Sequence, residues 1–273
     1  MMKISCFSDE IASKFDDQLR VISDLGMNFF EVRTVDDIPV LSLSDFSCRE
    51  IRKKADDLGM TITCVASPIG KNPVSFPLDE SVEQVKRASE IADFFGCNKI
   101  RIFSFFKEEG RTLDEEINMS AERLCAMAET AKDFGTVLVM EGGHNTVGEH
   151  GKDSLTLFQR VNNASLRCAF DAAAFVASGD TPLTDCLPHL LPYVEYMHMK
   201  DCRSGESKRV VVGEGDGQID KILDQVRDMD LVLSLEPHLD YAGATRGFSG
   251  EMPFRQAHKA LINMLERLKI DYI

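Results

Sequence analysis

Short apolar runs alternate with longer amphipathic stretches eight times along the 273 residues, and this alternation constrains the fold more than any other feature. The strand-like runs occupy residues 3–8, 29–33, 61–67, 99–104, 136–140, 166–170, 193–199 and 231–235. The helix-like stretches occupy residues 15–25, 44–59, 80–96, 113–135, 153–163, 182–191, 219–228 and 254–268. Regular alternation of this kind predicts a parallel sheet with helices packed against it.

A closed (β/α)8 TIM barrel and an open doubly wound sheet are both built from such units. Eight regular units without a dinucleotide-binding fingerprint favour the closed barrel, which needs about 250 residues. No linker, low-complexity tract or charge block marks a boundary, so residues 1–273 are expected to form a single α/β domain of this type.

Four residues with metal-binding side chains stand at the ends of apolar runs: Glu141, Asp171, His198 and Glu236. The carboxyl ends of barrel strands meet at one rim, so distant residues can surround one ion. Each acid alone is equally well explained as a helix cap or a loop anchor. Three carboxylates at one rim repel one another unless a cation neutralises them, so the set predicts one divalent metal ion. Three oxygen donors and one nitrogen favour Mn, with Mg, Co or Zn as alternatives.

A lone histidine in a mostly apolar run such as 193–199 is more often a core residue than a ligand. Alternation along the strand distinguishes the two interpretations, because successive side chains point to opposite faces. If His198 faces the barrel axis, Tyr196 faces it too, and Glu195 faces the helices. This arrangement is compatible with His198 as a ligand at the rim.

Five motifs carry a family resemblance: VLVMEGG with Glu141, RCAFDAAAF with Asp171, VEYMHMKD with His198, the glycine-rich VGEGDGQID, and LSLEPHL with Glu236. Over nearly its whole length the chain resembles the xylose-isomerase-like TIM barrel superfamily of sugar phosphate isomerases and epimerases. The resemblance implies that these acids and the histidine are shared metal ligands, and that the two glutamates also transfer protons. Ala174 departs from the pattern, since many relatives have histidine or asparagine there, and this counts against the endonuclease branch.

Six further residues are candidate substrate contacts: Phe7, Glu31, His144, Lys200, Arg203 and Glu214. Phe7 offers an apolar wall for a sugar face, whereas Glu31 either meets a substrate hydroxyl or pairs with Arg33 or Arg101. Lys200 and Arg203 either hold a substrate oxygen or are solvated loop charges. His144 follows Glu141 in a polar loop, and Glu214 lies in a glycine-rich segment that either lines the pocket or forms a turn.

A divalent ion chelated by a carbonyl and a hydroxyl oxygen of a sugar stabilises the charge that develops when a carbon-bound proton leaves. One glutamate takes that proton and the other returns one, which passes through an enediolate. The sequence therefore predicts a metal-dependent sugar or cyclitol isomerase or epimerase with Glu141 and Glu236 as catalytic residues. The alternatives are an inosose-dehydratase-like lyase and a catalytically silent carbohydrate-binding barrel.

Charge and cysteine content narrow the expected partners and location. The 45 acidic residues exceed the 31 basic ones, and a net charge of -14 disfavours nucleic acid. No apolar run reaches 18 residues, so no membrane span is expected. The eight cysteines occur without a C-x-x-C pair and the first residues lack a signal-peptide pattern, which favours a cytoplasmic protein. We expect a small carbohydrate or cyclitol as partner, and a homodimer or homotetramer by family resemblance.

Overall fold

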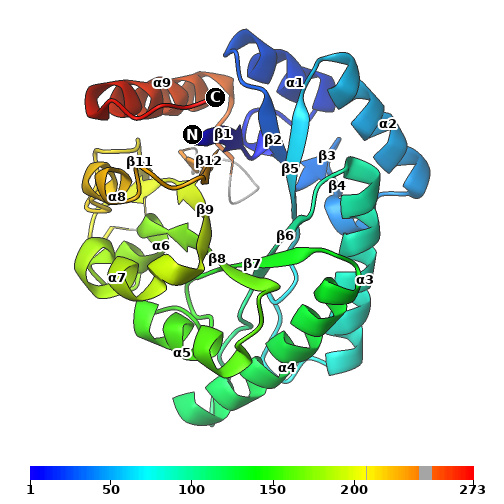
Figure 1. Cartoon of the computed structure of the whole chain (residues 1–273), viewed down its shortest axis with the longest axis vertical. Coiled ribbons are helices and arrows are strands. Elements are labelled where there is room, and N and C mark those ends of the chain that lie inside the picture. Colours follow the sequence, from blue (N-terminus) through cyan, green and yellow to red (C-terminus); the bar gives the residue numbers. More distant parts are fainter. Residues whose placement is uncertain (207, 240–247) are drawn as a thin grey trace.

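A parallel β-barrel forms the centre of the computed structural model, which describes residues 1–206, 208–239 and 248–273 (Figure 1). Its strands are β1 (Lys3–Cys6), β2 (Phe29–Val32), β5 (Thr61–Ala66), β6 (Lys99–Phe103), β7 (Val137–Glu141), β8 (Leu166–Asp171), β9 (Val194–Met199) and β12 (Val232–Leu235). They lie in the order β1-β12-β9-β8-β7-β6-β5-β2, and the paired strands are parallel. The predicted (β/α)8 TIM barrel is confirmed.

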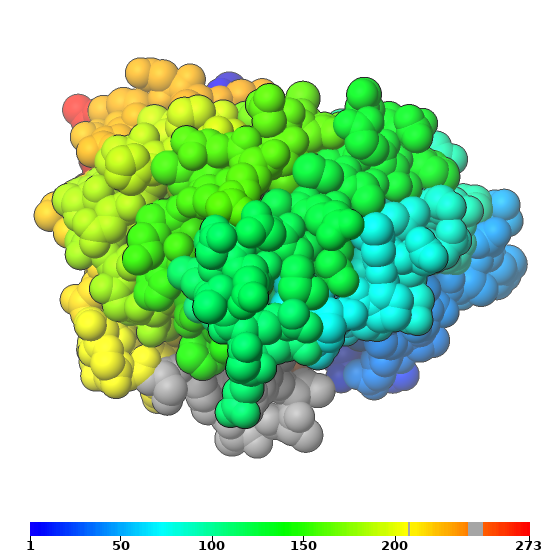
Figure 2. Space-filling view, turned by 90° about the horizontal axis from the view of Figure 1, so that it is seen from below, coloured from blue at the N-terminus to red at the C-terminus, as the bar shows by residue number. Residues whose placement is uncertain are grey.

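Helices surround the barrel: α1 (Phe15–Asp24), α2 (Asp45–Asp57), α3 (Leu78–Phe95), α4 (Leu113–Asp133), α5 (Gly151–Val161), α6 (Ala172–Ala177), α7 (Leu187–Leu190), α8 (Ile219–Gln225) and α9 (Glu251–Leu268). Local sequence sets several ends: Ser44 caps α2, and Thr112 forms a capping box with Glu115 at α4. In Figure 2 the middle of the chain, cyan to green, occupies the centre of the face in view. Within the described ranges no helix is long and apolar enough to cross a membrane.

Two parts of the α layer differ from the sequence pattern. The stretch 182–191 is not one helix but a π-helical turn (Pro182–Cys186) followed by α7, with prolines at both starts. The short helix α6 has no counterpart in the pattern, because it begins directly after β8 with Asp171 as its cap. Two small hairpins, β3 (Thr34–Val35) with β4 (Ile38–Pro39) and β10 (Asp201–Cys202) with β11 (Arg209–Val210), extend the loops at the rim.

Buried side chains form one cluster inside the barrel and a larger one between strands and helices. The interior cluster contains Cys64, Val139, Ala169, Tyr196 and Val232. Met197 and Met199 belong to the larger cluster, and Glu195 forms ion pairs on the outer face of β9. The predicted alternation along β9 is confirmed, so His198 faces the barrel interior with Tyr196. Each fully buried large apolar side chain stabilises the fold by roughly 1.5–3 kcal/mol.

The barrel closes between β1 and β2 at a narrow junction. Phe7 and Glu31 form an isolated parallel bridge there, and it is the single bridge between these two segments within the described residues. The pairing of β2 with β5 also shifts register between Phe30 and Glu31. This closing junction lies at the carboxyl end of both strands and therefore at the same rim as the predicted ligands.

Candidate metal centre

The carboxyl ends of four neighbouring strands bring the predicted ligands together. Glu141 ends β7, Asp171 ends β8, His198 lies in β9 and Glu236 directly follows β12. All four side chains are buried, and one ligand atom from each lies within 4.8 Å of the others. Three oxygens and one imidazole nitrogen at these separations can hold a divalent ion.

The two oxygens of the Asp171 carboxylate have different roles: one caps a helix and the other faces the candidate site. Oδ1 accepts a 3.0 Å hydrogen bond from the amide of Ala174 and so caps α6. Oδ2 lies 2.7 Å from Nζ of Lys200, but without hydrogen-bond geometry to it or to any other described group. Burial raises the pKa of this carboxyl, although Lys200 opposes the shift. The cap and the ligand interpretations of Asp171 are therefore compatible.

His198 is a buried imidazole, and neither ring nitrogen has a hydrogen-bond partner in the described part of the chain. Its Nδ1 lies 3.4 Å from an oxygen of Glu141 and 3.4 Å from an oxygen of Glu236. Burial opposes protonation, but Glu141 outweighs it and raises the pKa of the imidazole. Phe7 contacts the ring edge-on at 5.3 Å between centroids, so Phe7 supports His198. Two unused nitrogen atoms give His198 the capacity to bind an ion or a substrate.

A lysine lies at the centre of the acidic ligands. Nζ of Lys200 donates a 3.1 Å hydrogen bond to Oε1 of Glu141 and a 2.7 Å hydrogen bond to Oε2 of Glu236. With the contact to Asp171, one ammonium touches an oxygen of all three acids. Burial would lower the pKa of Lys200, but the three carboxylates raise it, so the ammonium stays charged.

Two arginines reach the glutamates from nearby strands of the barrel. Nη1 of Arg101, in β6, donates a 2.8 Å hydrogen bond to Oε2 of Glu141. Nη1 of Arg33, directly after β2, lies 3.3 Å from Oε1 of Glu236, and its Nε donates to Asp9 at 2.8 Å. Both guanidinium groups lie over the ring of Phe7, at 5.1 Å for Arg33 and 5.3 Å for Arg101. The sequence signal for Arg101 is a charged residue inside the apolar run IRIF.

Burial alone would raise the pKa of both glutamates, but the surrounding cations reverse this effect. Lys200, His198 and Arg101 hold the pKa of the Glu141 carboxyl well below its ordinary value. Lys200 likewise lowers the pKa of Glu236, although the neighbouring Glu141 opposes it. Both carboxylates are therefore ionised at neutral pH, which is the state needed to bind a cation or accept a proton.

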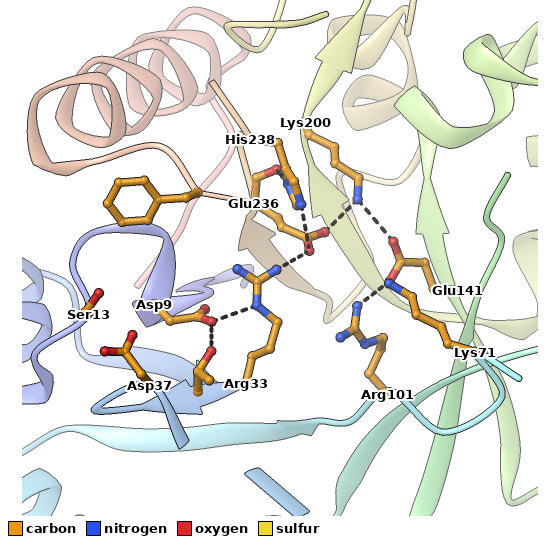
Figure 3. Close-up of a pocket in the computed structure, with 12 residues that line it drawn as sticks. Asp9, Ser13, Arg33, Asp37, Lys71, Arg101, Glu141, Lys200, Glu236 and His238 are labelled. Carbon is orange, nitrogen blue, oxygen red and sulfur yellow. Dashed lines mark hydrogen bonds and ion pairs between the residues drawn. The ribbon is translucent and has the colours of Figure 1, made fainter. Parts of the chain in front are cut away.

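Two of the four ligands, Glu141 and Glu236, line a cavity of about 430 Å³ (Figure 3). Its lining consists of Asp9, Ser13, Arg33, Thr34, Asp37, Lys71, Arg101, Glu141, Lys200, Glu236, His238 and Phe248. In Figure 3 the side chains of Lys71 and Arg101 extend towards Glu141. Nζ of Lys71 lies 4.3 Å from the ring centroid of Phe103 and forms no ion pair with another described residue. Burial, with help from Arg101, lowers the pKa of Lys71 to about 8.

The structure does not bring every predicted substrate contact to this cavity. The side chain of His144 is 89% exposed and contacts Glu149. Glu214 lines a separate depression beside α9, and its carbonyl accepts a hydrogen bond from Arg203. Glu31 is buried inside the barrel, where the hydroxyl of Ser234 donates to it. Lys200 is the one member of the predicted set among the lining residues.

The glycine-rich segment 212–220 is held away from this cavity by Asp201. The buried Asp201 carboxylate accepts 3.0 Å hydrogen bonds from the amides of Gly213, Gly215 and Gly217. A Cβ atom at Gly215 would lie 2.4 Å from Oδ1 of Asp201, so a side chain there would displace the anchor. Of the two interpretations of this motif, the structure supports the turn.

A second group of possible ligands shares Glu236 and contains Glu10 and His238. The guanidinium of Arg33 already lies 3.3 Å from Glu236 and 4.0 Å from Glu10. Nδ1 of His238 contacts Glu10 at 3.0 Å. Arg33 therefore lies between the two acids of this second group, as Lys200 lies among the three acids of the first.

Comparison with known proteins agrees with the barrel fold. The family model for a xylose isomerase-like TIM barrel matches residues 19–266. The chain belongs to this family. No curated protein matches this xylose isomerase-like barrel by sequence.

Several solved structures share the fold. A D-tagatose 3-epimerase-like protein has a TM-score of 0.81 at 17% identity, over 98% of both chains. The probable 3-DHS dehydratase AsbF from Bacillus anthracis has a TM-score of 0.77 at 20% identity, over 96% of this chain and 99% of its own. The IOLI protein with a bound zinc atom has a TM-score of 0.77 at 16% identity, over 98% of this chain and 99% of its own. At these identities the likeness establishes the fold of this xylose isomerase-like barrel.

Proposed function

We propose that this xylose isomerase-like barrel is a metal-dependent sugar or cyclitol isomerase or epimerase that moves a proton between two glutamates through an enediolate. The observation that carries the proposal is the buried group of Glu141, Asp171, His198 and Glu236, of which the two glutamates line a cavity. A cavity of about 430 Å³ suits a small polar molecule. The likeness to a D-tagatose 3-epimerase-like protein supports a carbohydrate substrate.

The residues present fit a single divalent ion. Oδ2 of Asp171 and both nitrogens of His198 are buried without a hydrogen-bond partner among the described residues. The donor set of three carboxylates and one imidazole suits manganese first, and also magnesium or cobalt. The similar IOLI structure contains zinc, which keeps zinc among the candidates. When bound, the ion supplies positive charge that stabilises negative charge on substrate oxygens.

The glutamates are the proton-transfer groups in this proposal. Their ligand oxygens lie within 4.8 Å of each other, and both carboxylates are ionised. Arg101 holds Oε2 of Glu141, and Arg33 holds Oε1 of Glu236. Each arginine therefore orients one carboxylate and leaves the other oxygen facing the centre of the site. One ionised glutamate accepts the carbon-bound proton. The other takes up a proton from water and returns it to the substrate, and the first then releases its proton to water, so that both are ionised again.

The test compares Glu141→Gln and Glu236→Gln with the matched control Glu195→Gln. Glu195 lies on the outer face of β9, where it pairs with Lys99 and Arg167. NMR in heavy water would follow deuterium incorporation into keto-sugars and cyclitols, and mass spectrometry would measure bound metal. We expect exchange at a carbinol carbon with the wild type and the control, reduced about 10²–10⁴-fold by either rim substitution.

Other outcomes identify other functions. Water loss with a new double bond would identify a lyase, an alternative that the likeness to a probable 3-DHS dehydratase favours. A wild type that binds carbohydrate but neither retains metal nor exchanges protons would identify a catalytically silent binding barrel.

A further inference from the structure

We propose that the Lys200 ammonium and the divalent ion are alternative occupants of one cation position, so the ion must displace Lys200 to bind. This inference rests on the metal site proposed above. It assigns to a residue of this chain the role of an internal competitor for the metal.

The geometry of the contacts carries the inference. Nζ of Lys200 lies 2.7 Å from Asp171, 2.7 Å from Glu236 and 3.1 Å from Glu141. A divalent ion would take these same carboxylates at about 2.0–2.2 Å. An ammonium within hydrogen-bond distance of the same three carboxylates would then face a doubly charged ion in a buried site, where repulsion is strong. One cation at a time can therefore occupy the centre of the three acids.

The surroundings of Lys200 allow its side chain to leave while its backbone stays. Lys200 lies between the end of β9 at Met199 and the start of β10 at Asp201. Asp201 is fixed by its hydrogen bonds to the glycine-rich segment. The side chain itself is a flexible four-carbon stem, and it lines the cavity. The ammonium can therefore withdraw into the cavity by rotation about side-chain bonds.

The exchange has a consequence for the metal-free protein. Three buried carboxylates would repel one another without a cation, and Lys200 provides the neutralising charge. The fold is then independent of metal, but metal affinity is reduced because a favourable contact of the ammonium must first be broken. Removing the ammonium should raise metal affinity and make stability depend on the ion.

The first experiment measures Mn²⁺ binding by titration calorimetry to the wild type, Lys200→Met and the control Lys132→Met. Lys132 is 63% exposed on α4 and contacts Glu129 at 3.3 Å. We expect Lys200→Met to bind Mn²⁺ at least tenfold more tightly than the wild type, and Lys132→Met to match the wild type. In EDTA, Lys200→Met should melt at a lower temperature than the wild type. Added Mn²⁺ should raise the melting temperature of Lys200→Met by more than it raises that of the wild type.

A second experiment uses the wild type alone and can therefore be interpreted even if Lys200→Met fails to fold. Acetylation of lysines, mapped by peptide mass spectrometry, would be followed with EDTA and with saturating Mn²⁺. We expect Lys200 to react slowly with EDTA and at least fivefold faster with Mn²⁺, while Lys132 reacts at the same rate in both.

Two results would overturn the inference while leaving the metal site intact. One is Mn²⁺ binding to the wild type with no gain in affinity in Lys200→Met. The other is Mn²⁺ binding that leaves the acetylation rate of Lys200 unchanged. If neither the wild type nor Lys200→Met binds Mn²⁺, the proposed metal site fails, and the inference fails with it.

Discussion

The rim of the barrel has an acidic half and a basic half. The acidic half consists of the consecutive strands β7, β8, β9 and β12, which carry the four candidate ligands. The basic half consists of β2, β5 and β6 with the loops that follow them, and it carries Arg33, Lys71 and Arg101. The halves meet where Arg101 of β6 donates to Glu141 of the adjacent strand β7, and where Arg33 after β2 reaches Glu236 after β12.

A buried glutamate behaves differently in the two halves. In the acidic half, cations outweigh burial and hold the pKa of Glu141 low. In the basic half, burial dominates and raises the pKa of Glu31, even though Ser234 donates to its carboxylate. The direction in which the long basic side chains point therefore decides which glutamate has a lowered pKa. The number of charged residues nearby in the sequence does not decide it.

Removing the buried arginine should have the largest effect, because it breaks the contact between the halves. Arg101→Met leaves Glu141 buried with one cationic partner fewer, and we expect a loss of about 3–5 kcal/mol of unfolding free energy. Urea denaturation at pH 7 measures this. Arg111→Met is the control, since Arg111 is 37% exposed and should cost at most about 0.5 kcal/mol. Equal effects of the two substitutions would show that the contact across the rim does not stabilise the fold.

The next prediction removes the charge of Glu141 itself. In Glu141→Gln the amide can still accept a hydrogen bond from Arg101, but the charge that both Arg101 and Lys200 contact is lost. We expect the metal-free variant to lose roughly 2–4 kcal/mol in urea denaturation at pH 7. An unchanged or increased stability would contradict the view that Arg101 and Lys200 offset the free-energy cost of burying this carboxylate.

The same substitution in the basic half should have the opposite sign. Glu31 has a raised folded-state pKa, so the native state holds its proton to higher pH than the unfolded chain, and stability falls as pH rises through that interval. Glu31→Gln should therefore be more stable than the wild type by about 1 kcal/mol at pH 8 and equal to it at pH 4. Urea denaturation at both pH values measures the difference. A variant that is less stable than the wild type at pH 8 would contradict the view that burying the charged Glu31 carboxylate costs stability.

The smallest expected effect concerns Lys71. Its folded-state pKa is lowered from 10.5 to about 8, so its charge costs stability below pH 8 and this cost is gone above pH 10.5. Protein atoms surround the ammonium, but the residue as a whole is exposed at the rim, where water screens its charge. We therefore expect Lys71→Met to gain at most about 0.5 kcal/mol at pH 7. Thermal unfolding from pH 7 to 10.5 should show the gain disappearing, whereas a constant difference would assign the effect to packing.

The acidic half could be predicted from the sequence, and the basic half could not. Short carboxylates and an imidazole stay close to their own strand ends, so the barrel pattern is enough to bring Glu141, Asp171, His198 and Glu236 together. Arginine and lysine side chains are long, and their targets depend on packing across the rim. The sequence offered Arg33 or Arg101 only as alternative partners of Glu31, whereas the guanidinium of Arg101 donates to Glu141.

Loops limited prediction for a different reason. The glycine-rich segment is positioned by a carboxylate at least 12 residues earlier in the chain, a contact that no local pattern reveals. Glu214 therefore lies away from the main cavity, although it was a candidate substrate contact. Similarly, Lys200 was recognisable as a rim residue, but its place between three acids depends on strand register.

The closing junction between Phe7 and Glu31 also affects how the barrel opens. One β-bridge and the hydrogen bond from Oγ of Ser8 to the carbonyl of Glu31 join these segments, whereas β6 and β7 are paired over five positions. Amide hydrogens at the junction should therefore exchange with solvent deuterium through smaller openings than those of β6 and β7. Phe7 packs on His198, so such an opening would loosen the support of the imidazole before any ligand strand separates from its neighbours.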